Sequence, residues 1–98
     1  MVIWTDTAQE TLKQIHDYIA RETKYYANRV AAEIIRTSKE LANFPNKGRQ
    51  VPEANRNEIR EVFIYSYRMI YKVTQNDIQI LRILHQHQNI DFTSFTST

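Results

Sequence analysis

Cysteine is absent from this chain of 98 residues, which contains only one glycine and two prolines. The absence of cysteine excludes a disulfide framework and thiolate chemistry, and it fits a reducing compartment. The scarcity of glycine and proline argues against a loop-rich or disordered protein. The first dozen residues contain Asp6 and Glu10 and no long apolar run, so we expect neither a signal peptide nor a membrane span. Together these absences predict a folded cytoplasmic protein.

A large excess of charge of one sign is also missing. Thirteen lysines and arginines face eleven aspartates and glutamates, which gives a formal net charge of only +2. Proteins that bind phosphate backbones usually use several clustered cations, so the composition does not indicate a strong nucleic-acid-binding protein. The length allows one domain with one core. We expect this domain to cover residues 1–88 and the polar segment 89–98 to be a mobile tail.

Hydrophobic periodicity predicts a short strand followed by two helices. Residues 2–4 are an apolar run, and the spacing of apolar residues then becomes helical. Thr7 and Glu10 match a capping box, so we expect the first helix to begin near Ala8. Pro45 disfavours helical geometry at Phe44, so we expect the second helix to end there. The apolar stripes that should face the core are Ala8, Leu12, Ile15 and Ile19 in the first helix, and Ala27, Val30, Ala31, Ile34, Ser38 and Leu41 in the second.

The second half of the chain is typical of a β-meander. Its loop 46–57 collects asparagine, glycine and proline, and we expect Gly48, the one glycine of the chain, to adopt a positive φ angle. Three runs rich in β-branched and aromatic residues follow at 59–64, 67–73 and 78–85, and their short connections predict antiparallel pairing. The expected fold is a two-layer α+β domain ordered β-α-α-β-β-β, with an α-hairpin packed on a small, mainly antiparallel sheet.

Alternation along the run 67–73 divides its side chains between two faces of the sheet. The uncharged face should contact the helices and consists of Tyr67, Met69, Tyr71 and Val73. Arg68 and Lys72 belong to the opposite face, together with Ile70. We therefore expect Arg68 and Lys72 to project from an open face of the sheet, where a partner could bind.

Several short motifs, together with the order of the elements, resemble the RelE/ParE superfamily, the toxins of type II toxin-antitoxin systems. The motifs are WTDTAQETLKQIHDYI near the start, LANFPNKGRQVPE in the middle, IREVFIYSYRMIYKV across the central hairpin and IQILRILHQHQ in the last strand. Their combination looks closer to ParE-like members than to RelE itself. The resemblance implies a toxin that a cognate antitoxin neutralises. It also implies one of two activities, because ParE-like members poison DNA gyrase and RelE-like members cut messenger RNA on the ribosome.

The catalytic residues that the resemblance to RelE-like ribonucleases would imply are only partly present. Cleavage through the 2′-hydroxyl needs a base, cations on the phosphate and an acid. Arg68 matches the central arginine of these enzymes, but Glu61 and Ile59 occupy their lysine positions. Gln88 occupies the position of their C-terminal arginine. A subgroup similar to YoeB works with a glutamate, this arginine and a histidine, and the residues that could imitate its set are Glu53, Arg68, and His85 or His87.

Each of these residues also has a simpler structural interpretation. Arg68 is equally suited to pair with Glu61 across the hairpin. His85 and His87 share one face of a strand, but with no cysteine and no evident third ligand we expect no metal site. Tyrosines can stack on bases, yet a core or rim position is the more usual role for Tyr65, Tyr67 and Tyr71.

The sequence therefore favours a ParE-like toxin that binds DNA gyrase, uses no cofactor and performs no chemistry of its own, with the ribosome-dependent ribonuclease as the alternative. The expected partner-binding residues are Arg49, Arg60, Arg68 and Lys72. The second expected partner is the cognate antitoxin. An extended segment of it would complete an edge strand of the sheet, and an amphipathic helix would cover an apolar groove beside the α-hairpin.

Overall fold

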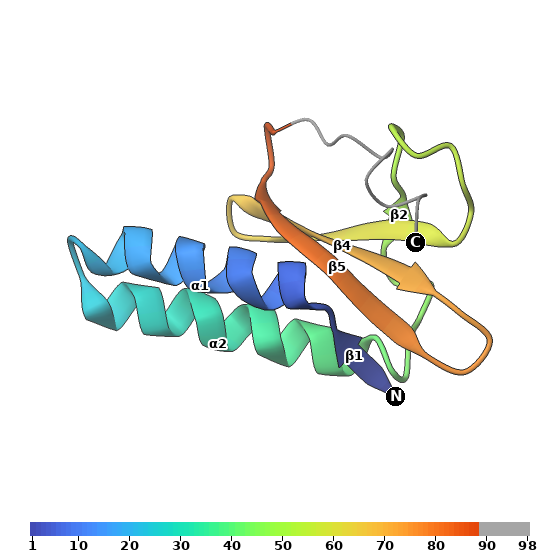
Figure 1. Cartoon of the computed structure of the whole chain (residues 1–98), viewed down its shortest axis with the longest axis horizontal. Coiled ribbons are helices and arrows are strands. Elements are labelled where there is room, and N and C mark those ends of the chain that lie inside the picture. Colours follow the sequence, from blue (N-terminus) through green and yellow to red (C-terminus); the bar gives the residue numbers. More distant parts are fainter. Residues whose placement is uncertain (89–98) are drawn as a thin grey trace.

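The protein consists of an α-hairpin packed on a five-stranded sheet in the computed structural model, which describes residues 1–88 (Figure 1). The elements are β1 (Val2–Trp4), α1 (Asp6–Ala20), α2 (Lys24–Glu40), β2 (Arg49–Gln50), β3 (Ile59–Ile64), β4 (Tyr67–Val73) and β5 (Ile78–His85). The strand order is β1-β5-β4-β3-β2, with β1 parallel to β5 and the other neighbours antiparallel. The predicted α+β class is confirmed, and β2 is a strand that the prediction had included in a loop. The predicted tail, 89–98, lies outside the described residues.

The first helix begins earlier than predicted, and its cap is a different threonine. Thr5 is the N-cap, and its hydroxyl oxygen accepts a hydrogen bond from the amide of Ala8 at 3.1 Å. The same hydroxyl donates to the carbonyl oxygen of Ile80 at 2.8 Å, which ties the start of α1 to β5. The predicted capping box of Thr7 and Glu10 is therefore wrong. Pairing of β1 with β5 brings Thr5 beside the Ile80 carbonyl, and this contact across the sheet selects the cap.

The second helix ends before the predicted stop at Phe44. Its last residue is Glu40, and Leu41 forms the C-cap with its amide donating to the Ser38 carbonyl oxygen. The chain then continues in turns, in which the amide of Phe44 donates to the carbonyl of Glu40 at 3.0 Å. Neither helix is long and apolar enough to cross a membrane.

The main core lies between the helices and the sheet. Both predicted helical stripes contribute to it, with Ala8 and Ile34 completely buried. The face of β4 assigned to the helices is confirmed, because Met69 and Tyr71 are inaccessible and Tyr67 and Val73 pack against them. Alternation thus predicted the buried face of the central strand correctly.

The opposite face of the sheet is covered, which corrects the prediction that it is open. Val51, from the segment 51–58, packs with Ile59, Ile70 and Leu84 in a second apolar cluster. Arg68, on this face, is only 6% exposed and does not project into solvent. The segment folds back over the sheet because Val51 and Ala54 supply apolar contacts there that a short polar loop would lack.

Gly48 is required for a reason other than the predicted positive φ angle, since no glycine has one. A Cβ atom at Gly48 would lie 2.7 Å from the Tyr71 hydroxyl and closer still to the carbonyl oxygen of Glu61. The amide of Gly48 donates to the Tyr71 hydroxyl at 2.9 Å, and that hydroxyl donates to the Pro45 carbonyl at 2.8 Å. Glycine is therefore present because the backbone passes directly against Tyr71 and β3.

Candidate functional site

Arg68 lies in a buried network of charges on the covered face of the sheet. Its Nη2 atom donates to Glu53 Oε2 at 2.8 Å, and its Nε atom lies 3.4 Å from Glu61 Oε1. The other carboxylate oxygen of Glu61 accepts from Arg49 Nε at 2.7 Å. The side chain of Glu61 is 0% exposed and that of Arg68 is 7% exposed, so each charge depends on the others for compensation. The alternative in which Arg68 pairs with Glu61 across the hairpin therefore describes this network correctly.

The other predicted partner-binding residues differ in their accessibility. Arg49 has a 62% exposed side chain, and its guanidinium lies 5.3 Å from the centre of the Phe63 ring. Arg60 donates to the Gly48 carbonyl oxygen at 2.9 Å and to Asn57, so it ties the segment before β3 to the sheet. Lys72 is partly exposed. Of the four cations, Arg49 is the most available to a partner and Arg68 the least.

The predicted catalytic set is not brought together. Tyr67 faces His85 in the register of β4 and β5, and their rings make an edge contact with centres 5.9 Å apart. Since Tyr67 belongs to the helix-side face, His85 lies on that side of the sheet, whereas Arg68 belongs to the other. His87 accompanies His85, with ring centres 5.5 Å apart. Glu53 and Arg68 are therefore in contact, while His85 lies on the other face of the sheet and His87, after the end of β5, lies beside His85.

Metal ligation has no support among residues 1–88, where no group of three histidine, aspartate or glutamate side chains could hold an ion.

The tyrosines of the sheet have different roles. Tyr71 is in the core, and burial raises the pKa of its phenol, with the Gly48 amide opposing the shift. Burial also raises the pKa of Tyr67, helped by the nearby Tyr26 and Tyr18. Tyr65 is half exposed in the turn between β3 and β4.

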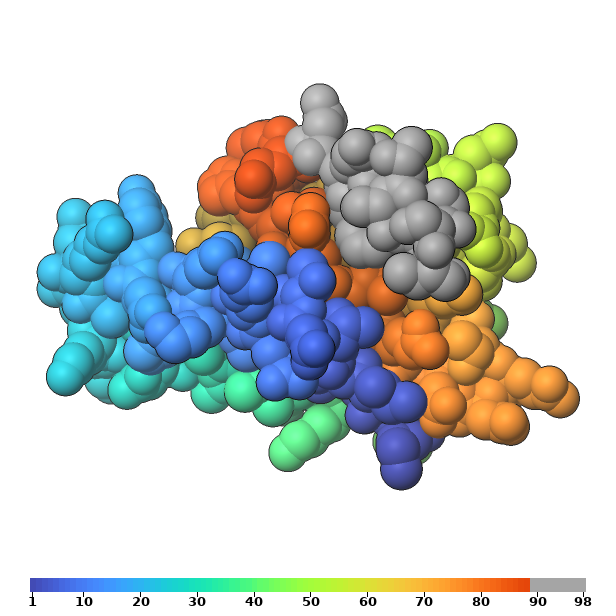
Figure 2. Space-filling view, in the orientation of Figure 1, coloured from blue at the N-terminus to red at the C-terminus, as the bar shows by residue number. Residues whose placement is uncertain are grey.

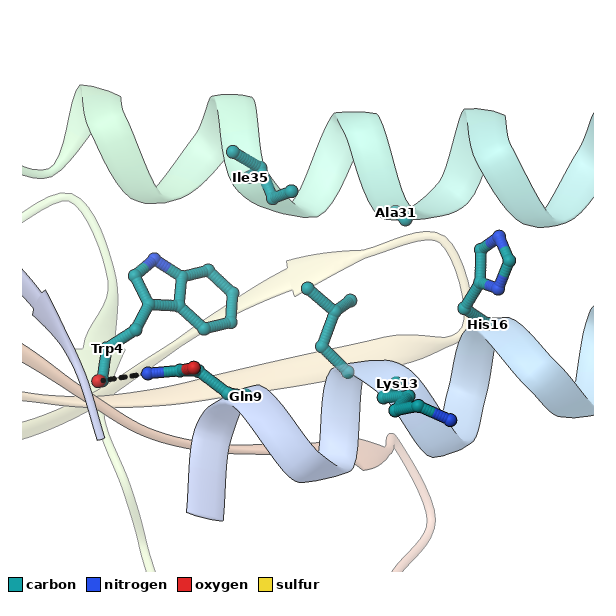
Figure 3. Close-up of a pocket in the computed structure, with 7 residues that line it drawn as sticks. Trp4, Gln9, Lys13, His16, Ala31 and Ile35 are labelled. Carbon is teal, nitrogen blue, oxygen red and sulfur yellow. Dashed lines mark hydrogen bonds between the residues drawn. The ribbon is translucent and has the colours of Figure 1, made fainter. Parts of the chain in front are cut away.

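An apolar groove lies on the outer side of the α-hairpin, with a volume of about 510 Å³. Ile35 of α2 is 40% exposed, and the Trp4 indole donates to the Ser38 hydroxyl at 3.3 Å on the same side. Figure 3 shows the residues that line this groove, which are Trp4, Gln9, Leu12, Lys13, His16, Ala31 and Ile35. A groove beside the α-hairpin is predicted from the sequence, but the residues that line it are not. The sequence signal that could have indicated the groove is Ile35, an apolar residue of α2 that follows the core residue Ile34 and is exposed.

The sheet leaves two edges available for pairing. β1 and β2 are the outermost strands, with three and two residues respectively. The amides and carbonyls on the outer side of such strands can pair with an extended segment of another chain.

Two antiparallel helices packed on one face of this mixed sheet match the fold of a solved type II toxin-antitoxin protein. The family model described as ParE toxin of type II toxin-antitoxin system, parDE, matches residues 2–90, and the chain belongs to this family.

Individual relatives support the same class. The chain is 32% identical over 84 residues to Toxin RelE2 of Caulobacter vibrioides, covering 86% of this chain and 92% of the relative. Among solved structures, the chromosomal ParDE toxin-antitoxin system from P. aeruginosa matches with a TM-score of 0.71 and 25% identity, over 86% of this chain and 92% of the other. The toxin-antitoxin complex RelBE2 from Mycobacterium tuberculosis has the same fold, with a TM-score of 0.65 and 20% identity, over 87% and 95% of the two chains.

Proposed function

We propose that this chain is a ParE-like toxin that stops growth by binding and poisoning DNA gyrase, without performing chemistry of its own. The observation that carries this proposal is the confinement of Arg68 between Glu53 and Glu61. A ribonuclease would need this cation to stabilise the charged phosphate of the transition state. Here the Arg68 side chain is 7% exposed, and its charge is already compensated by carboxylates. A toxin that acts by binding requires no such free cation. A gyrase target also implies that the toxin acts in the cytoplasm.

The alternative is a ribosome-dependent ribonuclease, and the observation in its favour is the relative named RelE2, at 32% identity. A ribonuclease mechanism places stricter requirements on the positions of these side chains. Either histidine would have to reach the same phosphate as Arg68, although His85 belongs to the opposite face of the sheet. The cation would also have to leave Glu53 at 2.8 Å. Both changes would have to accompany ribosome binding for this mechanism to operate.

The antitoxin is the second partner that we propose, and its mode of binding follows from the two accessible features of the fold. The structural relatives include toxin-antitoxin complexes. An amphipathic helix of the antitoxin would place its apolar face in the groove beside Trp4 and Ile35, while an extended segment would pair with β1 or β2. The groove offers mainly van der Waals contact, so partner choice would depend on shape and on the few polar groups around it.

The activity is tested with purified toxin and two targets, gyrase from a bacterium whose growth the toxin arrests and ribosomes carrying a test message. We expect loss of supercoiling at micromolar toxin, accumulation of broken DNA, and an intact message. The same toxin expressed without antitoxin should switch on a DNA-damage reporter as growth stops. Cleavage of the message with unimpaired supercoiling would instead establish the ribonuclease and refute the gyrase proposal.

Antitoxin binding is tested separately with Ile35→Asp, which introduces a charge into the groove at a position that is already 40% exposed. We expect the variant to remain toxic but to escape neutralisation by the product of the adjacent gene. Phe44→Asp is the matched control, because Phe44 is a 64% exposed apolar residue outside the groove. Equal neutralisation of both variants would show that the groove is not the antitoxin site.

A further inference from the structure

Four exposed tyrosines gather at the end of the molecule where the two helices meet. Tyr18 is 69% exposed, Tyr25 72%, Tyr26 44% and Tyr65 50%. They come from the end of α1, the start of α2 and the turn between β3 and β4. Tyr26 and Tyr65 are in contact across these elements, with ring centres 6.3 Å apart. Figure 2 shows this end of the α-hairpin, coloured blue to cyan, extending beyond the sheet.

Two arginines lie beside these rings, and a lysine is next to one of the tyrosines in the sequence. The guanidinium of Arg21 is 5.9 Å from the centre of the Tyr18 ring, and that of Arg29 is 6.0 Å from the centre of the Tyr25 ring. Lys24 immediately precedes Tyr25. Within residues 1–88, none of Arg21, Lys24 and Arg29 forms an ion pair with a carboxylate, although Arg29 is near enough to Glu33 to help lower the pKa of that carboxyl. The segment 18–29 contains these three cations and a single acidic residue, Glu22, so the formal charge of the segment is positive. We call these four tyrosines and three cations the tyrosine patch.

The backbone at Tyr65 adds an independent observation. Its φ angle is +52°, in the left-handed region that a bulky side chain rarely adopts. The residue occupies the turn between β3 and β4, where glycine would meet the geometry without strain. Tyrosine thus occupies a position that local folding does not favour, and its ring contacts Tyr26 on the exposed surface. Strained positions of this kind concentrate at functional sites.

We propose that the tyrosine patch binds single-stranded nucleic acid, with bases stacked on the tyrosine rings and phosphates on Arg21, Lys24 and Arg29. Rings beside cations that form no ion pair suit a ligand that carries a flat apolar face and a negative charge in every unit, as nucleotides do. An acidic peptide would compensate the cations but leave the rings without planar partners. A hollow of about 380 Å³, whose lining includes Tyr18, Arg21, Glu22 and Tyr26, gives room for one base. The inference does not depend on whether gyrase is the target.

The test uses fluorescence anisotropy of labelled oligonucleotides of about twelve thymidines or uridines, a length that fits known single-strand sites. Three cations predict a slope of log K against log salt of about −2, from about −0.7 per phosphate. Affinity should accordingly fall about 20-fold between about 50 and 200 mM salt. Tyr25→Ser should weaken binding at least about fivefold, the lower end expected for one stacked base. Arg21→Gln should weaken binding and make the salt slope less steep by about 0.7, the contribution of one phosphate contact. The matched controls, Phe44→Ser and Lys39→Gln, change an exposed aromatic and an exposed cation outside the patch and should leave affinity unchanged.

Tyr65→Gly separates binding from stability. Because glycine relieves the φ of +52°, the variant should unfold at an equal or higher temperature and yet bind the oligonucleotides more weakly. Absence of binding at about 50 mM salt would overturn the proposal, as would equal affinities of patch and control variants. A labelled peptide of about twelve glutamates serves as the competing ligand. If it binds as tightly as the oligonucleotides and Tyr25→Ser has no effect on either, the patch is a site for acidic protein segments and the proposal is wrong.

Discussion

Replacing Arg68 by methionine should cost the fold more stability than any surface substitution. The change removes a guanidinium that is 7% exposed and leaves the carboxylate of Glu61, which is 0% exposed, with Arg49 as its remaining ion-pair partner. Arg49 is 62% exposed and cannot by itself replace the lost compensation. Removing one member of a buried ion pair costs about 3–5 kcal/mol, a large part of the roughly 5–15 kcal/mol that holds a domain of this size together.

Urea unfolding followed by the fluorescence of Trp4, the one tryptophan of the chain, measures this loss. With a denaturant slope of about 1.5 kcal/mol/M, the midpoint should fall by about 2–3 M. Arg56→Met is the matched control, because Arg56 pairs with Glu58 at the surface, where both side chains are more than one-third exposed. Its cost should stay below about 1 kcal/mol.

A second substitution distinguishes uncompensated charge from lost packing. Adding Glu61→Leu to Arg68→Met removes both deeply buried charges, and replacement of a buried ion pair by apolar residues is often neutral. The double variant should therefore recover most of the stability lost by Arg68→Met alone. If Arg68→Met costs no more than Arg56→Met, or if the double variant is the least stable, the buried-charge argument is refuted.

Three further predictions concern local features. Thr5→Ala should destabilise the fold by about 1–2 kcal/mol while Thr7→Ala leaves it nearly unchanged, as compared by urea midpoints; the reverse order would restore the capping box at Thr7. Gly48→Ala should lower stability by about 1–3 kcal/mol through the collision with Glu61 and Tyr71, and an unchanged melting temperature would contradict that contact. Burial raises the pKa of Tyr71 above its ordinary 10.0, so this tyrosine ionises at a lower pH in the unfolded chain than in the folded one. The stability that the neutral phenol contributes is therefore complete below pH 10 and is lost as the pH rises further. Tyr71→Phe should reduce this alkaline loss, measured by unfolding between about pH 9 and pH 11.

The secondary structure was predictable because its signals are local. Period-2 alternation in 67–73 predicted which side chains of β4 meet the helices, and Met69 and Tyr71 are indeed inaccessible. The apolar stripes of both helices predicted the main core for the same reason. Neither inference required knowledge of a distant part of the chain.

The predictions that were wrong concern features determined by contacts between residues distant in the sequence. Thr5 and Thr7 are both suitable N-cap residues, and the hydrogen bond of Thr5 to the Ile80 carbonyl favours Thr5. Gly48 resembled a turn glycine, whereas its requirement comes from Tyr71, which is 23 residues away along the chain. The burial of Arg68 depends on a polar-looking segment whose only apolar signals were Val51 and Ala54. In the candidate site, the structure brings Glu53 and Arg68 of the predicted set into contact, while their separation from His85 could not be predicted from the sequence.

The net charge of the whole chain does not show which parts of its surface can attract a charged ligand. A total of +2 speaks against phosphate binding only if the charges are evenly mixed over the surface. Here the carboxylates of Glu53 and Glu61 are directed onto buried Arg68, so these groups compensate one another inside the protein. The segment 18–29 retains three cations against one carboxylate. Because charges more than about 8 Å apart are largely screened in physiological salt, an approaching strand would respond to this local excess. The salt dependence of oligonucleotide binding therefore measures a property that composition alone conceals.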